Sequence, residues 1–141
     1  MERRYIACDD SLCAGCELCE FVCAAGKAGS FDLEVSRIHL ARPETAVIAT
    51  VACRACDAPK CIEVCPRDAL SLAEDGTLLV DKVRCAGCGW CIEHCEYGDI
   101  VLDRRTKMAV VCDLCRELPE PRCVRFCPKG ALSVTPAENS R

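Results

Sequence analysis

Cysteine spacing is the feature that most restricts how this chain can fold. Sixteen of its 17 cysteines fall into four groups of four, and three residues separate the last two cysteines of every group. The first and third groups read C-x2-C-x2-C-x3-C, the second reads C-x2-C-x4-C-x3-C and the fourth reads C-x2-C-x7-C-x3-C. One unit is therefore repeated four times, with length changes confined to a single gap. The groups, called quartets one to four, are Cys13, Cys16, Cys19 and Cys23; Cys53, Cys56, Cys61 and Cys65; Cys85, Cys88, Cys91 and Cys95; and Cys112, Cys115, Cys123 and Cys127.

The abundance of cysteine indicates a scaffold held by crosslinks or metal. Seventeen cysteines in 141 residues far exceed ordinary usage. The N-terminal MERRYIACDD contains no apolar run of the kind found in export signals, and no segment approaches the roughly twenty apolar residues of a membrane span. We therefore expect a cytoplasmic protein without a membrane span, in which thiols stay reduced and bind metal more often than one another. A disulfide scaffold fits this setting poorly.

The repeated spacing favours iron–sulfur cubanes over zinc. Structural zinc usually takes two well-separated pairs of ligands, whereas three cysteines at x2, x2 spacing can wrap one cubane. The fourth cysteine is expected to head a short helix and, as in two-cluster ferredoxins, to ligate the other cluster. Pro66 and Pro128 follow two closing cysteines, as in the bacterial pattern, while Ala24 and Glu96 stand there in the other quartets. Since all sixteen positions are cysteine, we expect four [4Fe-4S] clusters; a zinc-binding interaction module is the alternative from another class.

The segments between the quartets predict short strands. Residues 70–72 and 77–80 flank Asp75-Gly76, a strong hairpin signal. Residues 37–40 and 46–51 are expected to form strands separated by Arg42-Pro43-Glu44, and 100–102 to pair with 108–111. Residues 5–7 and 131–134 supply terminal strands.

These elements predict an α+β fold in which short strands and short helices surround four cubane clusters. The hairpin between quartets two and three is the connector expected between the halves of a bacterial ferredoxin. We therefore expect one polyferredoxin domain built from two pseudo-symmetric, bacterial-ferredoxin-like modules. The inner module would span about 50–102, and the outer about 5–50 plus 103–135, with 136–141 as a flexible tail.

The motifs predict a relay rather than an enzyme. No open metal site, paired acid and base, or phosphate-cradling loop is legible, because Gly87 and Gly89 lie inside a ligand loop. The net charge of −4 argues against nucleic-acid binding. Residues 100–141 nevertheless carry a basic excess, and Arg104, Arg105 and Lys107 are candidates for a docking face.

Three residues near the quartets receive structural interpretations. Cys8, the seventeenth thiol, is expected to be a small buried hydrophobe on a strand. His94 is expected on a helix surface, and Trp90 is expected to pack against a cubane.

The complete cysteine pattern resembles that of the four-cluster iron–sulfur electron-transfer subunits. Members of that family accompany molybdenum and tungsten enzymes such as dimethyl sulfoxide reductase, formate dehydrogenase and aldehyde oxidoreductase, and also carbon monoxide dehydrogenases and hydrogenases. The resemblance runs from about Tyr5 to Val134. It implies a relay of single electrons between a larger catalytic oxidoreductase subunit and another redox partner, such as a flavin or iron–sulfur subunit, with several copies per complex allowed. A free-standing polyferredoxin, or a ferredoxin of a carbon monoxide dehydrogenase or hydrogenase, is the alternative.

The resemblance also implies that the closing cysteines are exchanged within nested pairs of quartets. Carried onto this sequence, the implied ligand sets are Cys13, Cys16, Cys19 and Cys127 for cluster 1; Cys53, Cys56, Cys61 and Cys95 for cluster 2; Cys85, Cys88, Cys91 and Cys65 for cluster 3; and Cys112, Cys115, Cys123 and Cys23 for cluster 4.

Overall fold

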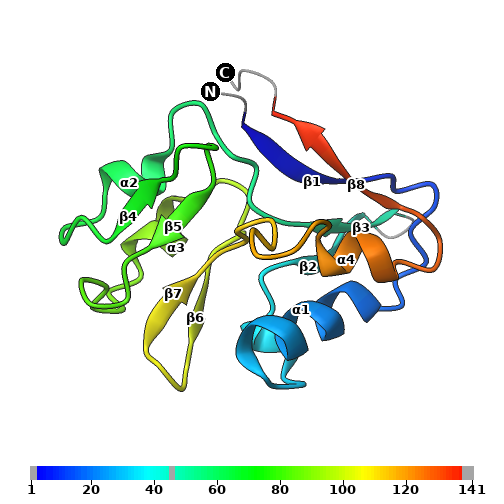
Figure 1. Ribbon diagram of the computed structural model, residues 1–141, viewed down its shortest axis with the longest axis horizontal. Coiled ribbons are helices and arrows are strands. Elements are labelled where there is room, and N and C mark those ends of the chain that lie inside the picture. The colour runs from blue at the N-terminus through cyan, green and yellow to red at the C-terminus, as the bar shows by residue number, and fades with distance from the viewer. Residues whose placement is uncertain (1–2, 45–46, 138–141) are drawn as a thin grey trace.

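The structure is a computed structural model that describes residues 3–44 and 47–137. Within these residues the chain forms four separate two-stranded antiparallel sheets and four α-helices, most of them short (Figure 1). This is the small α+β architecture expected from the sequence. The elements are β1 Arg4–Cys8, α1 Leu18–Ala28, the 3-10 helix η1 Leu33–Val35, β2 His39–Glu44, β3 Val47–Val51, α2 Lys60–Glu63, β4 Leu70–Leu72, β5 Leu78–Val80, α3 Trp90–His94, β6 Val101–Asp103, β7 Met108–Val110, α4 Arg122–Phe126 and β8 Leu132–Pro136.

The two ends of the chain pair with each other. Strand β1 runs antiparallel to β8, with Ile6 opposite Val134. The ladder is extended at both ends, because Asp9 N–H donates to the Ala131 carbonyl at 2.7 Å and Ala137 N–H donates to the Arg3 carbonyl at 2.8 Å. The predicted terminal strands are therefore confirmed, and they form one ribbon (Figure 1). Of the predicted tail, residues 138–141 lie outside the described residues.

Two of the predicted hairpins are confirmed. Strands β4 and β5 pair with Leu70 opposite Val80. Their turn is held by Asp75, whose Oδ1 accepts the Thr77 N–H at 3.0 Å, as expected for an Asp-Gly turn. Strands β6 and β7 pair within one residue of the predicted limits.

The hairpin of β2 and β3 differs from the prediction. Strand β2 continues through Arg42-Pro43-Glu44, which was expected to separate the strands. The register shifts between Ala41 and Glu44. Such an irregularity lets a strand contain a proline, because a bulged position need not donate to the ladder. Residues 45–46, part of the predicted second strand, lie outside the described residues.

Each helix begins one residue before the third cysteine of its quartet, so the prediction that the fourth cysteine heads a helix was wrong. The three closing cysteines outside α1 follow α2, α3 and α4 rather than preceding them. Helix α1 has 11 residues and is longer than expected. It ends at Gly29, whose left-handed φ of 62° lets its N–H reach the carbonyls of Ala24 and Ala25.

Buried side chains gather in two cores. One contains Ile6, Ile38 and Leu132 with three cysteines, and joins β1, β8, α1 and α4. The second contains Leu70, Ile100 and other residues of β4, β5, α3 and β7. Between them a cleft of about 690 Å³ is bordered by α1, β5 and β7. Cysteines are part of both cores and others pack against them, so the packing depends on whatever binds their sulfurs.

Candidate functional site

The four cysteine loops share one backbone device. In every quartet the residue just before the second cysteine has a positive φ: 69° at Gly15, 52° at Ala55, 70° at Gly87 and 61° at Leu114. This left-handed residue bends the loop between the first two cysteines in the same sense each time. The sequence repeat is therefore also a repeat of backbone conformation. This holds in quartets two and four as well, where the left-handed residue is not a glycine and the sequence does not indicate it.

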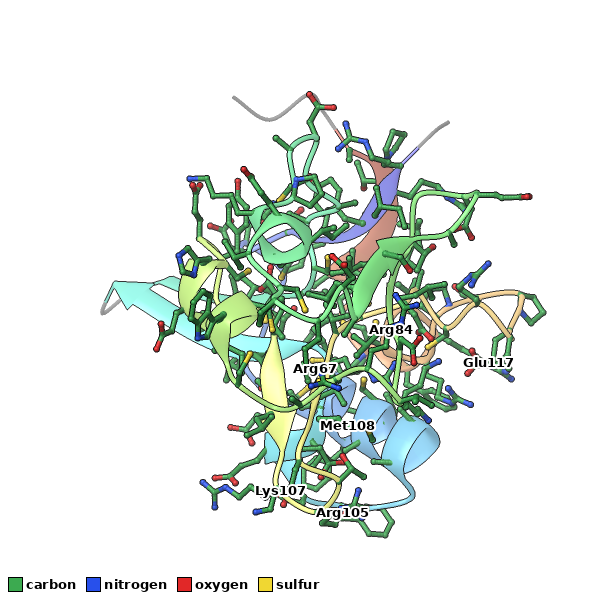
Figure 2. All side chains as sticks on the ribbon, turned by 90° about the vertical axis from the view of Figure 1, so that its left-hand side faces the viewer. Arg67, Arg84, Arg105, Lys107, Met108 and Glu117 are labelled. Carbon is green, nitrogen blue, oxygen red and sulfur yellow. The ribbon has the colours of Figure 1, made fainter. Side chains whose placement is uncertain are left out.

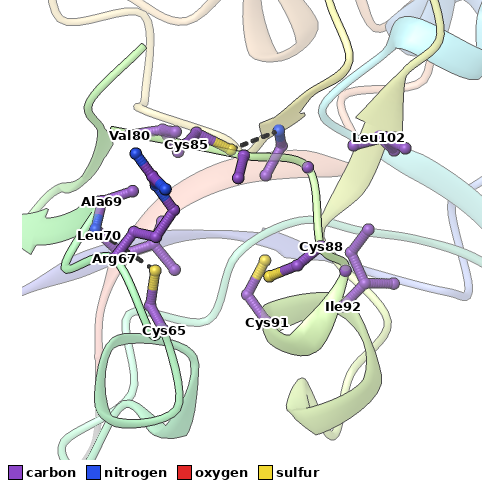
Figure 3. A pocket seen from close by; sticks show the side chains of 14 residues that line it. Cys65, Arg67, Ala69, Leu70, Val80, Cys85, Cys88, Cys91, Ile92 and Leu102 are labelled. Atoms are coloured by element: carbon purple, nitrogen blue, oxygen red, sulfur yellow. Dashed lines mark hydrogen bonds between the residues drawn. The ribbon is translucent and has the colours of Figure 1, made fainter. Parts of the chain in front are cut away.

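One cavity is lined by four thiols from two quartets. Cys85, Cys88 and Cys91 come from the third quartet, and Cys65, the closing cysteine of the second, faces them (Figure 3). Apart from Arg67, the remaining lining is small or apolar, with Leu70, Val80 and Ile92 among its members. Three thiols of one loop and one of another thus surround a single space.

A second cavity repeats this arrangement at the other end of the molecule. Cys13, Cys16 and Cys19 of the first quartet line it together with Cys127, the closing cysteine of the fourth. The sequence distance between Cys13 and Cys127 is bridged by the β1–β8 ribbon, which holds the two chain ends together.

The other eight thiols also gather across quartets. Burial raises the pKa of Cys123 to about 12, with further contributions from nearby Cys23 and Cys115. Burial likewise raises the pKa of Cys61 to about 11, with Cys95 and Cys56 adding to the shift. The structure thus brings the closing cysteine of quartet one to quartet four, and that of quartet three to quartet two.

The thiols are set in surroundings that oppose free thiolates. Burial raises the pKa of Cys19 and of Cys53 to about 12, and raises the pKa of Cys112 well above 9.0. A buried thiolate needs a positive partner, and iron supplies one when it displaces the proton. No disulfide joins any of the 17 cysteines.

Backbone N–H groups already point at several of these sulfurs. Ala69 N–H donates to Cys65 Sγ at 3.3 Å, and Ala131 N–H donates to Cys127 Sγ at 3.4 Å. In both cases the donor lies four residues after the closing cysteine. Further backbone N–H groups donate to Cys23 Sγ, Cys85 Sγ and Cys112 Sγ. Donors aimed at sulfur stabilise the charge of bound thiolates and tune the potential of a cluster.

The donor set fits iron–sulfur cubanes. Four thiols surround each space, backbone donors face the sulfurs, and the surroundings are otherwise largely apolar. Within residues 3–44 and 47–137 there is no group of three or more Cys, His, Asp or Glu side chains arranged to hold a single metal ion. A zinc ion would need four ligands within about 2.3 Å of one point.

Three other predicted residues are placed as follows. Cys8 ends β1, packs against the first core and accepts the Thr50 N–H at 3.4 Å. Its place on a strand is confirmed, but it is half-buried rather than buried. His94 is exposed on α3 and its Nδ1 lies 2.9 Å from the Trp90 carbonyl, so the surface prediction is confirmed. Trp90 is 52% exposed, and its packing against a cubane stays a prediction.

Sequence reasoning missed two charged residues at the thiols. Arg122 Nη1 lies 3.7 Å from Cys115 Sγ, yet nothing in the sequence separates it from Arg125 on the same helix. Asp99 is 1% exposed and its charge raises the pKa of Cys53, after the larger effect of burial. Asp99 lies four residues after a closing cysteine, and the sequence around it is typical of an exposed loop.

Fold and thiol geometry together define a small ferredoxin-like iron–sulfur protein. The family model of the 4Fe-4S dicluster domain matches residues 45–136, and the chain belongs to this family. It carries four [4Fe-4S] clusters, and its function is electron transfer. No helix in the described part of the chain combines the length and apolarity needed to cross a bilayer.

The relatives are electron-transfer proteins. The chain is 41% identical to the NADH-dependent phenylglyoxylate dehydrogenase subunit beta of Aromatoleum evansii over 94% of its length, but spans only 30% of that protein. It is 38% identical to the putative electron transport protein YsaA of Escherichia coli, covering 96% of this chain and 92% of the relative. A probable anaerobic dimethyl sulfoxide reductase chain, YnfG of Escherichia coli, is 31% identical and is covered to 73%.

A solved structure shares the fold of this chain. The active site complex BamBC of benzoyl coenzyme A reductase, with benzoyl-CoA bound, contains a chain that superposes with a TM-score of 0.58. The two sequences are 26% identical over 96% of this chain and 81% of that chain.

Proposed function

We propose that this chain relays single electrons between a catalytic oxidoreductase subunit and a second redox partner. Each cluster would be held by three cysteines of one quartet and the closing cysteine of another. The observation that carries the proposal is that two cavities are each lined by such a set of four thiols. The chemistry that the clusters supply is reversible one-electron exchange with little rearrangement. The chain's own residues set distance, exposure and charge.

The thiol sets follow one another in a line. The first set lies against the fourth, because Cys19, Cys23 and Cys123 belong to one buried core. The fourth set neighbours the second through Cys112 and Cys53. Since Cys91 is near enough to raise the pKa of Cys61, after burial and closer thiols, the second set neighbours the third. These contacts support an electron path in the order one, four, two, three.

The two ends of this path reach the surface. Cys16 in the first set and Cys88 in the third are exposed, unlike the other fourteen cysteines of the quartets. Each end is therefore a candidate point of electron entry or exit. At the first, Leu12 and Leu18 are exposed beside Cys16; at the second, the half-exposed Trp90 adjoins Cys88. Exposed apolar side chains at a redox centre are typical of a docking surface.

One basic side chain lines the cavity at the Cys88 end, and further basic side chains lie on the same face of the molecule. Arg67 lines the cavity of the third set, and its Nε donates to the Arg84 carbonyl at 2.7 Å. Arg67, Arg84, Arg105 and Lys107 lie on the same face of the molecule (Figure 2). All four are exposed, although Arg84 is paired with Asp81 and Arg105 with Asp103. The basic rim, defined as these four residues, is a docking face for an acidic redox partner.

The two pseudo-symmetric modules belong to this proposal. The inner module holds quartets two and three, and the outer module holds quartets one and four around it. The two buried cores support such a division. Ala109 and Val111 pack with the inner core, so we place hairpin β6–β7 with the inner module and its boundary near Val111.

No catalytic site of its own is proposed for this chain, and substrate chemistry would belong to a partner of the molybdenum or tungsten type. A free-standing polyferredoxin is the second candidate. It is favoured by YsaA, a relative of nearly the same length that is named only as an electron transport protein. A cytoplasmic location remains a prediction.

Metal analysis combined with purification of the native complex tests the proposal. Anaerobically purified protein should be brown and contain about sixteen irons and as many acid-labile sulfides per chain. It should also co-purify with a larger oxidoreductase and be reduced by that enzyme's substrate. Zinc without sulfide would overturn the relay, and a loaded chain that purifies alone would favour the free polyferredoxin.

A further inference from the structure

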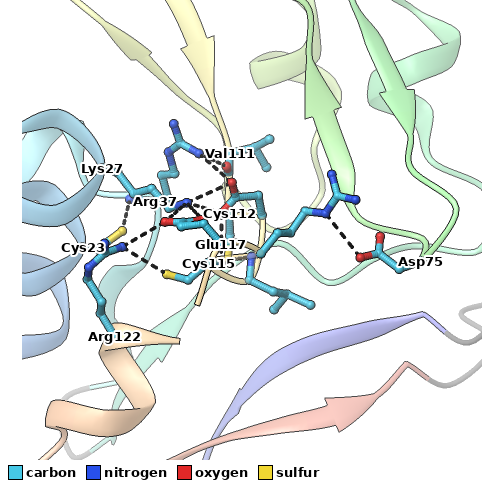
Figure 4. Close-up of polar contacts among 12 residues, drawn as sticks. Cys23, Lys27, Arg37, Asp75, Val111, Cys112, Cys115, Glu117 and Arg122 are labelled. Atoms are coloured by element: carbon cyan, nitrogen blue, oxygen red, sulfur yellow. Dashed lines mark hydrogen bonds and ion pairs between the residues drawn. The ribbon is translucent and has the colours of Figure 1, made fainter. Parts of the chain in front are cut away.

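A network of charged side chains surrounds the thiol set of Cys23, Cys112, Cys115 and Cys123, and Arg122 is its member closest to sulfur (Figure 4). The guanidinium Nη1 of Arg122 lies 3.7 Å from Cys115 Sγ and 3.2 Å from Glu117 Oε1. Arg122 therefore brings a positive charge directly to a ligand of this set, while a carboxylate on its other side holds it in place.

Two further cations border the same set. Arg37 donates its backbone N–H to Cys23 Sγ at 3.3 Å, and its guanidinium lies 3.6 Å from Asp113 Oδ2. Lys27 Nζ lies 2.9 Å from both Asp113 and Glu117. Three cations and two carboxylates thus form one network with an excess of positive charge. A nearby positive charge stabilises the negative charge that a cluster gains on reduction. This stabilisation is greatest where the cations lie nearest the sulfurs.

The cations of the network are partly shielded from water, while Glu117 is half-exposed. The Lys27 side chain is 10% exposed and the Arg122 side chain 24%. Helix α1 passes close to the guanidinium, because a Cβ at Gly26 would collide with the Arg122 side chain. Charges held this way are screened by solvent and salt much less than surface charges are.

The other thiol sets have different electrostatic surroundings. Asp99 and Glu96 border the second set, where their charges raise the pKa of Cys56, after burial and Cys95. At the first set Glu20 adds to the effect of burial on the pKa of Cys19, and Lys129 lines the cavity. At the third set Arg67 is exposed and donates to a carbonyl. At these three sets no charged side chain in the described part of the chain donates to a sulfur.

We propose that Arg122, supported by Arg37 and Lys27, makes the set of Cys23, Cys112, Cys115 and Cys123 the first of the four to accept an electron. This rests on the proposed relay function. The reaction is the gain of one electron from a low-potential one-electron donor, with no ligand bond broken and no proton required. Arg122 favours this gain because its charge offsets the added negative charge. Since this set lies second in the path, the first electron would rest inside the chain, away from both exposed ends.

Redox titration of the full, cluster-loaded chain tests the proposal. The titration is followed by electron paramagnetic resonance, after iron and sulfide have been shown equal in every variant. We expect Arg122→Gln to shift the midpoint of the first-reduced component to lower potential, and Glu117→Gln to shift the same component to higher potential. Arg122→Lys, which keeps the charge at a different geometry, should lie between Arg122→Gln and the unaltered chain.

Arg125→Gln is the matched control, because Arg125 lies on the same helix but stacks 5.6 Å from the Phe126 ring rather than on a sulfur. It should leave all four midpoints unchanged. The proposal is overturned if Arg122→Gln leaves the midpoint potential of the first-reduced component unchanged. It is also overturned if Arg125→Gln shifts that potential equally. The relay function fails separately, if the unaltered chain holds no reducible iron.

Discussion

The backbone N–H of Ala109 donates a hydrogen bond to Sγ of Cys85 across 3.4 Å. Strand β7 is thereby tied to the first thiol of the third quartet. The same hairpin also closes over the next residues of that loop, because the Lys107 carbonyl lies where a Cβ of Gly87 would be. The β6–β7 hairpin is thus a structural cover for one thiol set.

Replacing Gly87 by alanine should damage this set. Both Gly87 and Gly89 have left-handed φ values, 70° and 81°, so alanine at either costs about 1 kcal/mol in backbone strain. Only at Gly87 does the added methyl also strike backbone, that of Lys107, while at Gly89 it meets nothing within 4 Å. Gly87→Ala should therefore lose iron and bleach at lower temperature than Gly89→Ala, as measured by visible absorption on heating. Equal iron loss in the two variants would show that backbone strain alone, and not the collision with Lys107, causes the damage.

Cys8 and Cys127 should respond differently to removal of their sulfur. Cys127 shares a cavity with Cys13, Cys16 and Cys19, whereas Cys8 only borders Cys13 and accepts the Thr50 N–H. Cys127→Ala is expected to lose at least one of about sixteen irons, and Cys8→Ala to keep them all. Iron and sulfide analysis after anaerobic purification gives the answer. Iron loss in Cys8→Ala would make the seventeenth thiol a ligand.

Asp99 should make stability depend on pH. Burial raises the pKa of Asp99 from 3.8 to about 7, opposed by the charge of Arg54, and neither carboxylate oxygen has a hydrogen-bond partner among the described residues. The folded chain therefore keeps a proton that the unfolded chain loses. This contribution to stability is present below pH 3.8 and is lost as pH rises through 7. The Cys53 and Cys56 thiols also face this carboxyl group.

Asp99→Asn should therefore raise the bleaching temperature more at pH 8 than at pH 5. Asp103 is a matched control: it is also buried, but hydrogen bonds from Arg105 outweigh burial and lower its pKa. Asp103→Asn should lower the bleaching temperature at pH 8. If Asp99→Asn raises the bleaching temperature equally at both pH values, the pH dependence does not come from ionisation of Asp99.

The basic rim should control encounter with an acidic electron carrier. Reversing two of its charges, Arg67→Glu with Lys107→Glu, should slow electron exchange with such a carrier by about tenfold or more at low salt. The difference should shrink as salt rises. Stopped-flow spectroscopy measures the rate. Lys129→Glu, which alters the rim of the cavity at the other end, is the control, and an equal effect there would exclude a single acidic docking face.

The sequence predicted the elements that depend on local signals. The Asp75-Gly76 turn and the cysteine spacing depend only on residues close together in the sequence. The β4–β5 hairpin and the thiol loops could therefore be predicted. The closing-cysteine exchange came from family resemblance, not from local chemistry. The passage of β2 through Pro43 was missed because a bulge depends on the partner strand.

Charged residues at the thiols could not be predicted for a related reason. Arg122 and Arg125 are three residues apart on one short helix, and only the packing of α1 against α4 decides that the former meets a sulfur. Asp99 is buried by elements distant in sequence. Placement of a charge against a sulfur is a tertiary property, whereas the cysteine pattern is a local one.

The β1–β8 ribbon has a consequence for biosynthesis. Cys127 is held at the cavity of quartet one by the pairing of β8 with β1, so this thiol set cannot be completed until the residues of β8 have left the ribosome. The thiols of quartets two and three meet within a much shorter stretch and are available earlier. Nested pairing in the fold therefore favours an order of maturation, in which the half of the electron path at sets two and three is loaded before the half at sets one and four.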